Sequence, residues 1–258
     1  MRTIDINSDL GESFGNWRLG DDEAVIPVIT SANVACGFHA SDPVTMIRTV
    51  GLCKQSGVEV GAHPGLPDLL GFGRRPMRIT PGDCYAYVLY QVGALQAVLA
   101  AEGMTLHHIK PHGAFYSVLR EDDPLAEAFC DATLALMPEP VVYWPEGKDL
   151  ALPRAARERE IRVVMEVYVD MDYAPDGSIV IQRSKHETDL ELASAQIRRF
   201  LEEGVVLTTD GSLIPLEAES ICVHGDGPNA VEVIAALRRT IGECGHSVAP
   251  LAGAASAR

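Results

Sequence analysis

Short apolar, β-branched runs alternate with longer amphipathic runs along most of this chain, and this alternation restricts the fold more than any other feature. A helix that returns the chain between two strands makes those strands parallel, so a repeated strand–helix rhythm predicts a mostly parallel sheet. The strands are expected at residues 3–6, 32–36, 58–62, 107–110, 141–144, 161–167 and 221–224.

Several of the amphipathic runs begin with the start signals of helices. Asp42-Pro43 and Thr80-Pro81 each combine an N-cap side chain with a first-turn proline, which is a common opening of an α-helix. The expected helices cover residues 43–55, 81–101, 124–136, 187–202 and 228–244.

The repeated units predict a single α/β domain, a seven-stranded βα barrel with one strand fewer than the eight-stranded type. An open doubly wound sheet is the alternative, although no Gly-x-Gly-x-x-Gly turn, typical of its nucleotide-binding form, follows the first strand. We expect the barrel domain to cover residues 1–248 and to be followed by a loose tail at 249–258. Asp176-Gly177, between the β-rich runs 163–169 and 178–182, is expected to form a hairpin turn, and residues 207–216 a similar hairpin outside the barrel.

Charge and cysteine usage exclude several classes of protein. The formal net charge is −15, from 21 Lys and Arg against 36 Asp and Glu, which argues against binding to nucleic acid or to an anionic membrane surface. The six cysteines are scattered without paired spacing, as in a protein with reduced thiols. No secretory signal and no apolar run of membrane-spanning length is expected. We therefore expect a cytoplasmic protein.

Histidines, carboxylates and a lysine follow nearly every predicted strand. In a parallel βα sheet the carboxyl ends of the strands meet on one face, where functional groups gather. Buried ionisable groups are costly unless they are paired, so an unneeded cluster of four strand-end histidines is hard to explain by packing. The groups expected at this face include Asn7, Asp9, Glu12, Asn33, His39, His63, Lys110, His112, Glu166, Asp170, His224 and Asp226.

Such a cluster suits two kinds of chemistry. Histidines and carboxylates that share a cavity can transfer protons near neutral pH. Lys110 could stabilise a developing oxyanion or bind a carboxylate or phosphate, and Asp9 and Glu12 could act as acid and base or hold Lys110. The same residue types bind divalent metals, and a metal site built from separate strand ends stays open because no short ligand motif is present.

The long glycine-rich segment 64–76 is typical of a mobile flap over a site. Its adjacent Arg74 and Arg75 could bind an anionic substrate, and the alternative is a surface loop with both arginines in solvent. Arg78 is expected in solvent. The sequence contains no Walker A motif, so any ATP must be bound by another structure or by a partner.

Several long blocks resemble successive motifs of the LamB/YcsF family, whose members are A subunits of 5-oxoprolinase. The blocks are DINSDLGESFGNW, GDDEAVIPVITSANVACGFHASDP, GVEVGAHPGLPDLLGFGRRPM, HIKPHGAFY and SICVHGDGPNAV, and the resemblance runs from residue 4 to about 245. It implies a barrel similar to the glycoside hydrolase/deacetylase group. It also implies a protein that, with partner subunits B and C, opens 5-oxo-L-proline to L-glutamate while ATP is hydrolysed to ADP and phosphate.

The resemblance assigns roles to the residues that match the family's blocks. A site of histidines and carboxylates could direct water at a phosphorylated lactam and protonate its nitrogen, while Lys110 or an arginine holds the substrate. The catalytic candidates among them are Asp9, Glu12, His39, His63, Lys110, His112, Glu166 and His224, and Asp170 and Asp226 are candidates for substrate binding. The strand ends add Asn7 and Asn33, and the segment 64–76 adds Arg74 and Arg75, as further substrate-binding candidates.

Two stretches depart from the family pattern. Met171 stands where the family block Glu-Ala-Phe-Ala-Asp-Arg has its arginine, and Lys185 or Arg183 could replace that cation. Residues 184–190 differ from the usual Gly-Ala-Val-Ile.

Two other functions remain open on the sequence. The chain could be a metal-dependent deacetylase or amidohydrolase that acts alone, by analogy with the barrel group. It could also be a non-catalytic subunit that binds a small acid for a partner enzyme.

Overall fold

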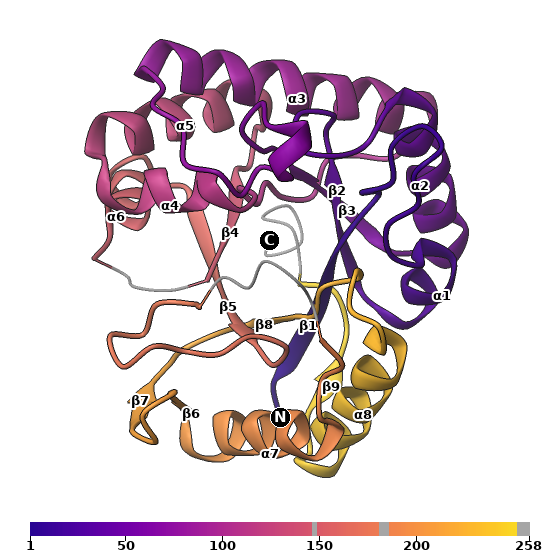
Figure 1. The fold of residues 1–258 in the computed structure, drawn as a ribbon, viewed down its shortest axis with the longest axis vertical. Helices are drawn as coiled ribbons and strands as arrows, with labels where there is room; N and C mark the ends of the chain where they lie inside the picture. Colours follow the sequence, from indigo (N-terminus) through magenta and orange to yellow (C-terminus); the bar gives the residue numbers. More distant parts are fainter. Residues whose placement is uncertain (146–148, 181–185, 252–258) are drawn as a thin grey trace.

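A ring of parallel strands forms the centre of the computed structural model, which describes residues 1–145, 149–180 and 186–251 (Figure 1). The strands pair in the order β3-β2-β1-β8-β5-β4, and each of these neighbouring pairs is parallel. Their bounds are β1 Thr3–Leu10, β2 Ser31–Ala35, β3 Glu59–His63, β4 Val141–Trp144, β5 Arg162–Tyr168 and β8 Ser220–Cys222.

The segment 107–110 closes this ring between β3 and β4. Ile109 bridges Ala62 of β3 on one side and Val142 of β4 on the other, both in parallel register. The Lys110 amide donates to the Ala62 carbonyl at 2.8 Å, and the Tyr143 amide donates to the Ile109 carbonyl at 3.0 Å. The prediction of a seven-stranded βα barrel is therefore confirmed, and the open-sheet alternative is excluded.

Side chains of β1 alternate between the inside and the outside of the barrel, as the two-residue period of a strand requires. Ile4 and Ile6 belong to the main hydrophobic core, which lies between the strands and the helices. Asp5 points inward, where it accepts hydrogen bonds from Ser31 (2.8 Å) and from the Tyr143 hydroxyl (3.1 Å). The interior of the barrel is therefore polar along much of its length.

The amino end of the barrel is filled by a small apolar cluster of Val141, Tyr143, Val164 and Leu251. Leu251 belongs to the expected loose tail, yet it is buried, and its carbonyl oxygen lies 2.9 Å from the His107 Nε2 atom. Residues 249–251 thus pack on the barrel, and β9 (Ser247–Val248) pairs with β1 before them. Residues 252–258 lie outside the described part, and the domain boundary at 248 stays a prediction.

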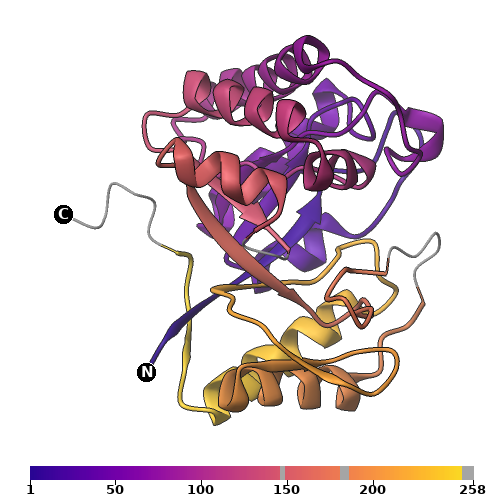
Figure 2. The same cartoon turned by 90° about the vertical axis from the view of Figure 1, so that its left-hand side faces the viewer.

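All five expected helices are present, and they cover opposite sides of the ring (Figure 2). The cap predictions are also confirmed: the Asp42 carboxylate accepts from the Val44 and Thr45 amides, and Thr80 forms a capping box with Asp83. The bounds are α2 Pro43–Ser56, α3 Pro81–Ala101, α5 Asp123–Leu136, α7 Leu190–Glu203 and α8 Ala230–Glu243.

Three short helices were not expected from the sequence. α4 (Ala114–Glu121) starts directly after a Lys-Pro-His-Gly stretch that is typical of a loop, and α6 (Ala151–Glu158) contains Pro153 within only eight residues. α1 (Asp22–Val25) is a single turn that runs into a 3-10 turn at Ile26–Val28. Such short segments give too few apolar repeats for a periodicity argument.

Helix α3, with 21 residues, is long and apolar enough by length and composition alone to cross a membrane. The prediction that no apolar run reaches membrane-spanning length is therefore wrong for Pro81–Ala101. In the fold, α3 packs against α2 and α5, and its Val88, Val92, Leu95 and Leu99 side chains are fully buried in the core. This packing is that of a helix in the outer layer of a barrel.

Two hairpins decorate the carboxyl half of the chain. β6 (Val205–Leu207) and β7 (Leu213–Pro215) pair antiparallel, which confirms the excursion at 207–216. The turn at Asp176-Gly177 is also present, but Tyr173 rather than the run 163–169 pairs with Ile179, because that run is β5 of the barrel. Residues 181 and 182 of the expected partner run lie outside the described residues.

Candidate active site

The carboxyl ends of the barrel strands surround a small cavity of about 70 Å³. Its wall contains five predicted catalytic side chains and one predicted substrate-binding arginine, and most of them follow the carboxyl ends of strands. The functional lining residues are Asp9, His63, Arg74, Lys110, His112 and His224, with Tyr168 and Met171 beside them.

Lys110 lies at the centre of a buried ion-pair network. Its ammonium Nζ is 3.0 Å from Asp9 Oδ1 and 3.2 Å from Glu166 Oε1. It also donates to Asn7 Oδ1 at 3.3 Å and to the Cys222 sulfur at 3.1 Å. Since the side chain is only 5% exposed, these contacts replace its water shell almost completely.

The two ends of this ion pair hold each other in the charged state. Burial by itself would lower the pKa of Lys110, but Asp9, Cys222 and Glu166 raise it well above its ordinary value. Burial also opposes charge on Asp9, yet His63 and Lys110 bring the pKa of that carboxyl well below its usual range. Lys110 is therefore a fixed cation at neutral pH, suited to stabilising negative charge rather than to accepting a proton.

Asn7, Asn33 and Glu166 form a fully buried layer beneath the cavity. The Asn33 amide donates at 2.7 Å both to Asn7 Oδ1 and to Asp9 Oδ1, and the Asn7 amide donates to Glu166 Oε1 at 2.7 Å. From the sequence, the two asparagines are expected to bind substrate and Glu166 to catalyse. The structure does not bring them to the cavity wall, and their contacts instead fix the positions of Asp9 and Lys110.

Each of the three cavity histidines is held through one ring nitrogen by an acceptor. His63 Nδ1 lies 2.8 Å from the Lys110 carbonyl oxygen, and His112 Nε2 lies 2.8 Å from the Phe72 carbonyl oxygen. His224 Nδ1 lies 2.8 Å from a carboxylate oxygen of Asp170. Because these oxygens accept, the contacting nitrogens carry the protons, and the other nitrogen of each neutral ring has a lone pair.

The inner nitrogens of the three rings point toward one another and toward Asp9. His63 Nε2 is 3.0 Å from His112 Nδ1 and 3.2 Å from Asp9 Oδ2. His224 Nε2 is 3.6 Å from the same Asp9 oxygen. The predicted meeting of His63, His112 and His224 in one place is thus present in the structure.

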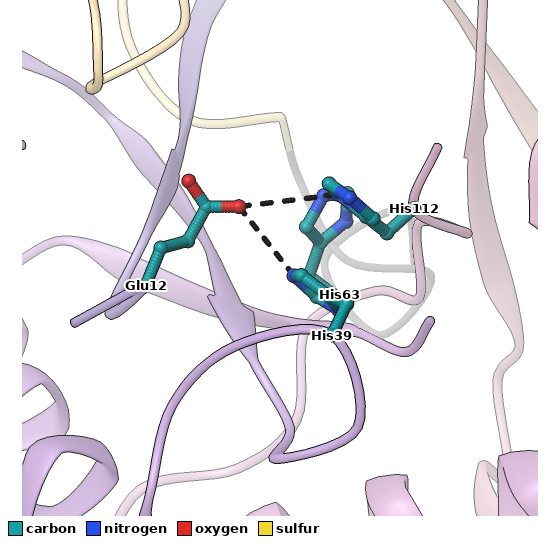
Figure 3. Close-up of side chains that lie close together, drawn as sticks. All are labelled: Glu12, His39, His63 and His112. Carbon is teal, nitrogen blue, oxygen red and sulfur yellow. Dashed lines mark hydrogen bonds and ion pairs between the residues drawn. The ribbon is translucent and has the colours of Figure 1, made fainter. Parts of the chain in front are cut away.

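Glu12 and His39 lie behind the cavity wall, against His112 (Figure 3). The His39 ring stacks on the His112 ring with 3.7 Å between centroids, and Glu12 Oε1 lies 3.4 Å from His39 Nε2. Burial lowers the pKa of His39 and of His112 well below the ordinary value, and burial with the nearby Asp9 raises the pKa of Glu12 well above it. With His63, these residues bring ligand atoms within 4.8 Å of one another, which is close enough to hold a metal ion.

The glycine-rich segment 64–76 wraps closely around this histidine stack. Gly73 has a φ of +62°, and a Cβ atom there would lie 2.6 Å from His39 Cβ and 2.9 Å from His112 Cδ2. The Ala114 amide donates to the Gly73 carbonyl at 2.8 Å, which ties the segment to α4. Motion of this segment as a flap stays a prediction.

The two arginines of the segment point to different places. The Arg74 guanidinium lines the cavity, stacks over Phe72 at 4.8 Å and lies 3.8 Å from Asp226 Oδ2. Arg75 pairs with Asp68, and its side chain is 65% exposed. The structure therefore brings Arg74 to the site together with Asp226, but it does not bring Arg75 there.

Two further side chains complete the site and were missed in the sequence. Tyr168 lines the cavity and donates its hydroxyl to Glu166 Oε2 at 3.0 Å, and Cys222 contacts Lys110. Each stands two residues from a predicted group on its own strand or strand end, Tyr168 after Glu166 and Cys222 before His224. The two-residue period of a strand was the signal that could have found them.

Met171, which departs from the family block, lines the same cavity. The wall is thus apolar at a position where the family resemblance implies a cation. Arg183 and Lys185, the expected replacements, lie outside the described residues.

The fold and the site together define a class: a single-domain seven-stranded βα barrel with a buried site of histidines, carboxylates and a lysine at its carboxyl-end mouth. The catalytic domain of a peptidoglycan N-acetylglucosamine deacetylase from Eubacterium rectale shares this fold, with a TM-score of 0.50 at 9% identity over 97% of this chain and 89% of that chain. The sequence model of the LamB/YcsF family matches residues 4–256, and the chain belongs to that family.

Two relatives are similar over nearly their whole length. A protein from Thermococcus onnurineus that is named as the A subunit of 5-oxoprolinase is 46% identical over 250 residues, which cover 96% of this chain and 97% of that protein. The crystal structure of a lactam utilization protein from Thermus thermophilus superposes with a TM-score of 0.88 at 40% identity, over 96% of this chain and 100% of that chain. The resemblance inferred from the sequence blocks is therefore confirmed.

Proposed function

We propose that this chain is the A subunit of an ATP-dependent 5-oxoprolinase, a cytoplasmic hydrolase that opens 5-oxo-L-proline to L-glutamate while ATP becomes ADP and phosphate. The names of the relatives, a 5-oxoprolinase A subunit and a lactam utilization protein, support a lactam as the substrate. The word subunit in the first name supports a complex, and we propose subunits B and C as the partners.

The observation that carries the proposal is a fixed ammonium and a histidine lone pair that face one small cavity. Opening a lactam builds negative charge on the carbonyl oxygen and requires a base for the attacking water. Lys110 supplies a buried positive charge, and His224, oriented by Asp170, supplies a lone pair on Nε2. Arg74 on the same wall provides a cation for the substrate carboxylate.

The reaction has three steps in this proposal. The lactam oxygen attacks the γ-phosphorus of ATP, and ADP leaves. In the second step, water adds to the activated ring carbon and gives a proton to His224, and the carbon–nitrogen bond breaks as the nitrogen takes up a proton. A second water then hydrolyses the resulting acyl phosphate to glutamate and phosphate. Lys110 stabilises the oxygen anion during the first two steps, while Asn7 and Asn33 keep Asp9 and Lys110 in place.

ATP binding is assigned to the complex rather than to a known motif of this chain. The 258 residues contain no Gly-x-x-x-x-Gly-Lys-Ser/Thr sequence. We therefore propose that the partner subunits contribute to holding the nucleotide against the cavity.

The test is release of glutamate and phosphate from 5-oxoproline and ATP, measured with this chain alone, with subunits B and C alone, and with all three together. We expect turnover in the full mixture and a loss of about 10²-fold or more in kcat for His224→Gln. His246→Gln, which changes a histidine far from the cavity, is the matched control. A folded His224→Gln protein that supports turnover at the wild-type rate would contradict the assignment.

A metal-dependent deacetylase that acts alone is the second candidate, because the buried cluster of Glu12, His39, His63 and His112 has the composition of a metal site and the fold is shared with a deacetylase. Acetate release from N-acetylated sugars or amino acids without ATP, and no glutamate release by the three-subunit mixture, would favour it. A non-catalytic binding subunit would bind 5-oxoproline, but substitutions at His63, His112 or His224 would then leave turnover of the complex unchanged.

A further inference from the structure

Two facing histidine nitrogens in the cavity wall both lack a proton when their rings are neutral. His63 donates through Nδ1 to the Lys110 carbonyl, and His112 donates through Nε2 to the Phe72 carbonyl. The remaining nitrogens, His63 Nε2 and His112 Nδ1, lie 3.0 Å apart and direct their lone pairs at one another. Lone pairs at this distance repel, so a proton or a cation must lie between them. A proton on His63 Nε2 would also face Asp9 Oδ2, which lies 3.2 Å from that nitrogen.

A shared proton would satisfy only part of this cluster. It would join His63 to His112, but Glu12 Oε1 and both ring nitrogens of His39 would still lack a hydrogen-bond partner among residues 1–145, 149–180 and 186–251. These atoms belong to side chains that are more than nine-tenths buried. Unpartnered polar atoms in such places are costly, and an ion with several coordination positions would satisfy a lone pair on each of the four side chains.

The spacing of the acceptor atoms fits a tetrahedral ion. Ligand atoms about 2.1 Å from a tetrahedral centre lie about 3.4 Å from one another. Glu12 Oε1 is 3.4 Å from His39 Nε2 and 3.9 Å from His112 Nδ1, and the two facing nitrogens of His112 and His63 are 3.0 Å apart. The four side chains come from separate segments of the chain and lie close together (Figure 3).

We propose that Glu12, His39, His63 and His112 bind one divalent transition-metal ion, and that Zn²⁺ fits this ligand set best. Three imidazoles and one carboxylate favour zinc-like ions, whereas Mg²⁺ and Ca²⁺ prefer oxygen ligands. Metal-binding histidines usually donate a hydrogen bond from the ring nitrogen that does not contact the metal, which fixes the orientation of the ring. The hydrogen bonds of His63 and His112 to backbone carbonyls are of this kind. This inference goes beyond the proposed function, because it concerns metal binding by the chain itself.

The position of the site connects the ion to the cavity. His63 and His112 also line the cavity wall, so the ion lies next to the space where a ligand would bind. Because four protein ligands would complete its tetrahedral shell, the bound ion would hold His63 and His112 in place at the wall, and a ligand oxygen could reach it only as a fifth ligand.

The test is calorimetric titration of Zn²⁺ into the full chain after removal of the affinity tag and dialysis against a chelator. We expect one ion per chain, a rise in melting temperature with added Zn²⁺, and, with Co²⁺, visible absorption typical of tetrahedral coordination. Glu12→Gln and His39→Gln, which are close in size to the native residues, should each weaken the affinity at least tenfold. His246→Gln should bind as the wild type does.

The outcomes separate metal binding from catalysis. Absence of stoichiometric binding, or equal affinity in the wild type, Glu12→Gln and His39→Gln, would overturn the proposal. Melting curves recorded without metal show whether each variant is folded, and His63→Gln replaces any variant that is not. Because binding is read without turnover, a chain that binds one ion but forms no active 5-oxoprolinase would keep this inference and refute the proposed function.

Discussion

Replacing Lys110 by methionine should destabilise the protein strongly, because it leaves two buried carboxylates without their cation. Nζ lies 3.0 Å from Asp9 Oδ1 and 3.2 Å from Glu166 Oε1, and both carboxyl side chains are at most 6% exposed. At an effective dielectric constant of about 20, each contact is worth about 5 kcal/mol before the cost of desolvation is subtracted. Burial of the ammonium offsets much of this gain, so we expect the free energy of unfolding to fall by about 3–5 kcal/mol.

The surface pair between Lys54 and Glu102 provides a matched control. Its charged atoms are 3.1 Å apart, but the Lys54 side chain is 51% exposed. Solvent screening and side-chain entropy reduce the value of such a pair, so Lys54→Met should cost less than about 1 kcal/mol. Urea unfolding at pH 7, followed by far-UV circular dichroism, measures both variants under the same conditions.

A double variant tests whether the uncompensated charge is the cause. Lys110→Met combined with Glu166→Gln removes one of the stranded carboxylates, so it should recover part of the loss caused by Lys110→Met alone. The interpretation of the buried network is wrong if Lys110→Met lowers the free energy of unfolding no more than Lys54→Met does. It is also wrong if the double variant is less stable than Lys110→Met by the full amount that Glu166→Gln costs in the wild type.

Two further predictions concern the backbone around the site. Asp42→Ala should lower the free energy of unfolding by about 1 kcal/mol, because the Asp42 carboxylate accepts from the Gly15, Thr45 and Val44 amides, whereas Asp42→Asn keeps an acceptor and should lose less. These hydrogen bonds lower the pKa of Asp42 to about 2, below its usual value of about 3.9. The stabilisation by the Asp42 charge is therefore present above pH 4 and disappears as the pH falls toward 2. Urea midpoints of the wild type and Asp42→Asn that stay equally far apart at pH 7 and pH 2 would contradict this. Gly73→Ala should lower the free energy of unfolding by about 1–3 kcal/mol, because Gly73 has a φ of +62° and a Cβ atom there would lie 2.6 Å from His39. Gly93→Ala, at a position in α3 with open space around it, should be neutral or stabilising. Equal melting temperatures of the two variants would contradict this prediction.

The order of strands and helices could be predicted because it depends on local patterns. Apolar runs and capping residues such as Asp42 and Thr80 carry their information within a few neighbouring residues. The closing strand was harder to define, because the segment 107–110 pairs only through single bridges at Ile109, with Pro111 directly after it. The closure itself depends on hydrogen bonds to both β3 and β4, which are contacts between segments far apart in the chain.

The position of a polar residue after an apolar run does not show how deep in the barrel its side chain lies, at the cavity wall or below it. Asn7 and Glu166 point inward below the cavity because of the two-residue period, and they meet only across the paired strands β1, β8 and β5. Arg75 takes the surface position that the sequence left as the alternative. Its partner Asp68 stands only seven residues earlier, and a local ion pair within a loop leaves no trace in apolar periodicity.

The buried network also determines which substitutions can report on chemistry. Asp9 accepts hydrogen bonds from both Asn33 and Lys110, so changing it disturbs three segments of the barrel together with the site. His224 differs, because it follows the end of β8, is 14% exposed and is held by Asp170. A loss of turnover in an Asp9 variant would therefore combine destabilisation with lost chemistry. A loss in His224→Gln with unchanged melting would identify a group that acts in the reaction itself.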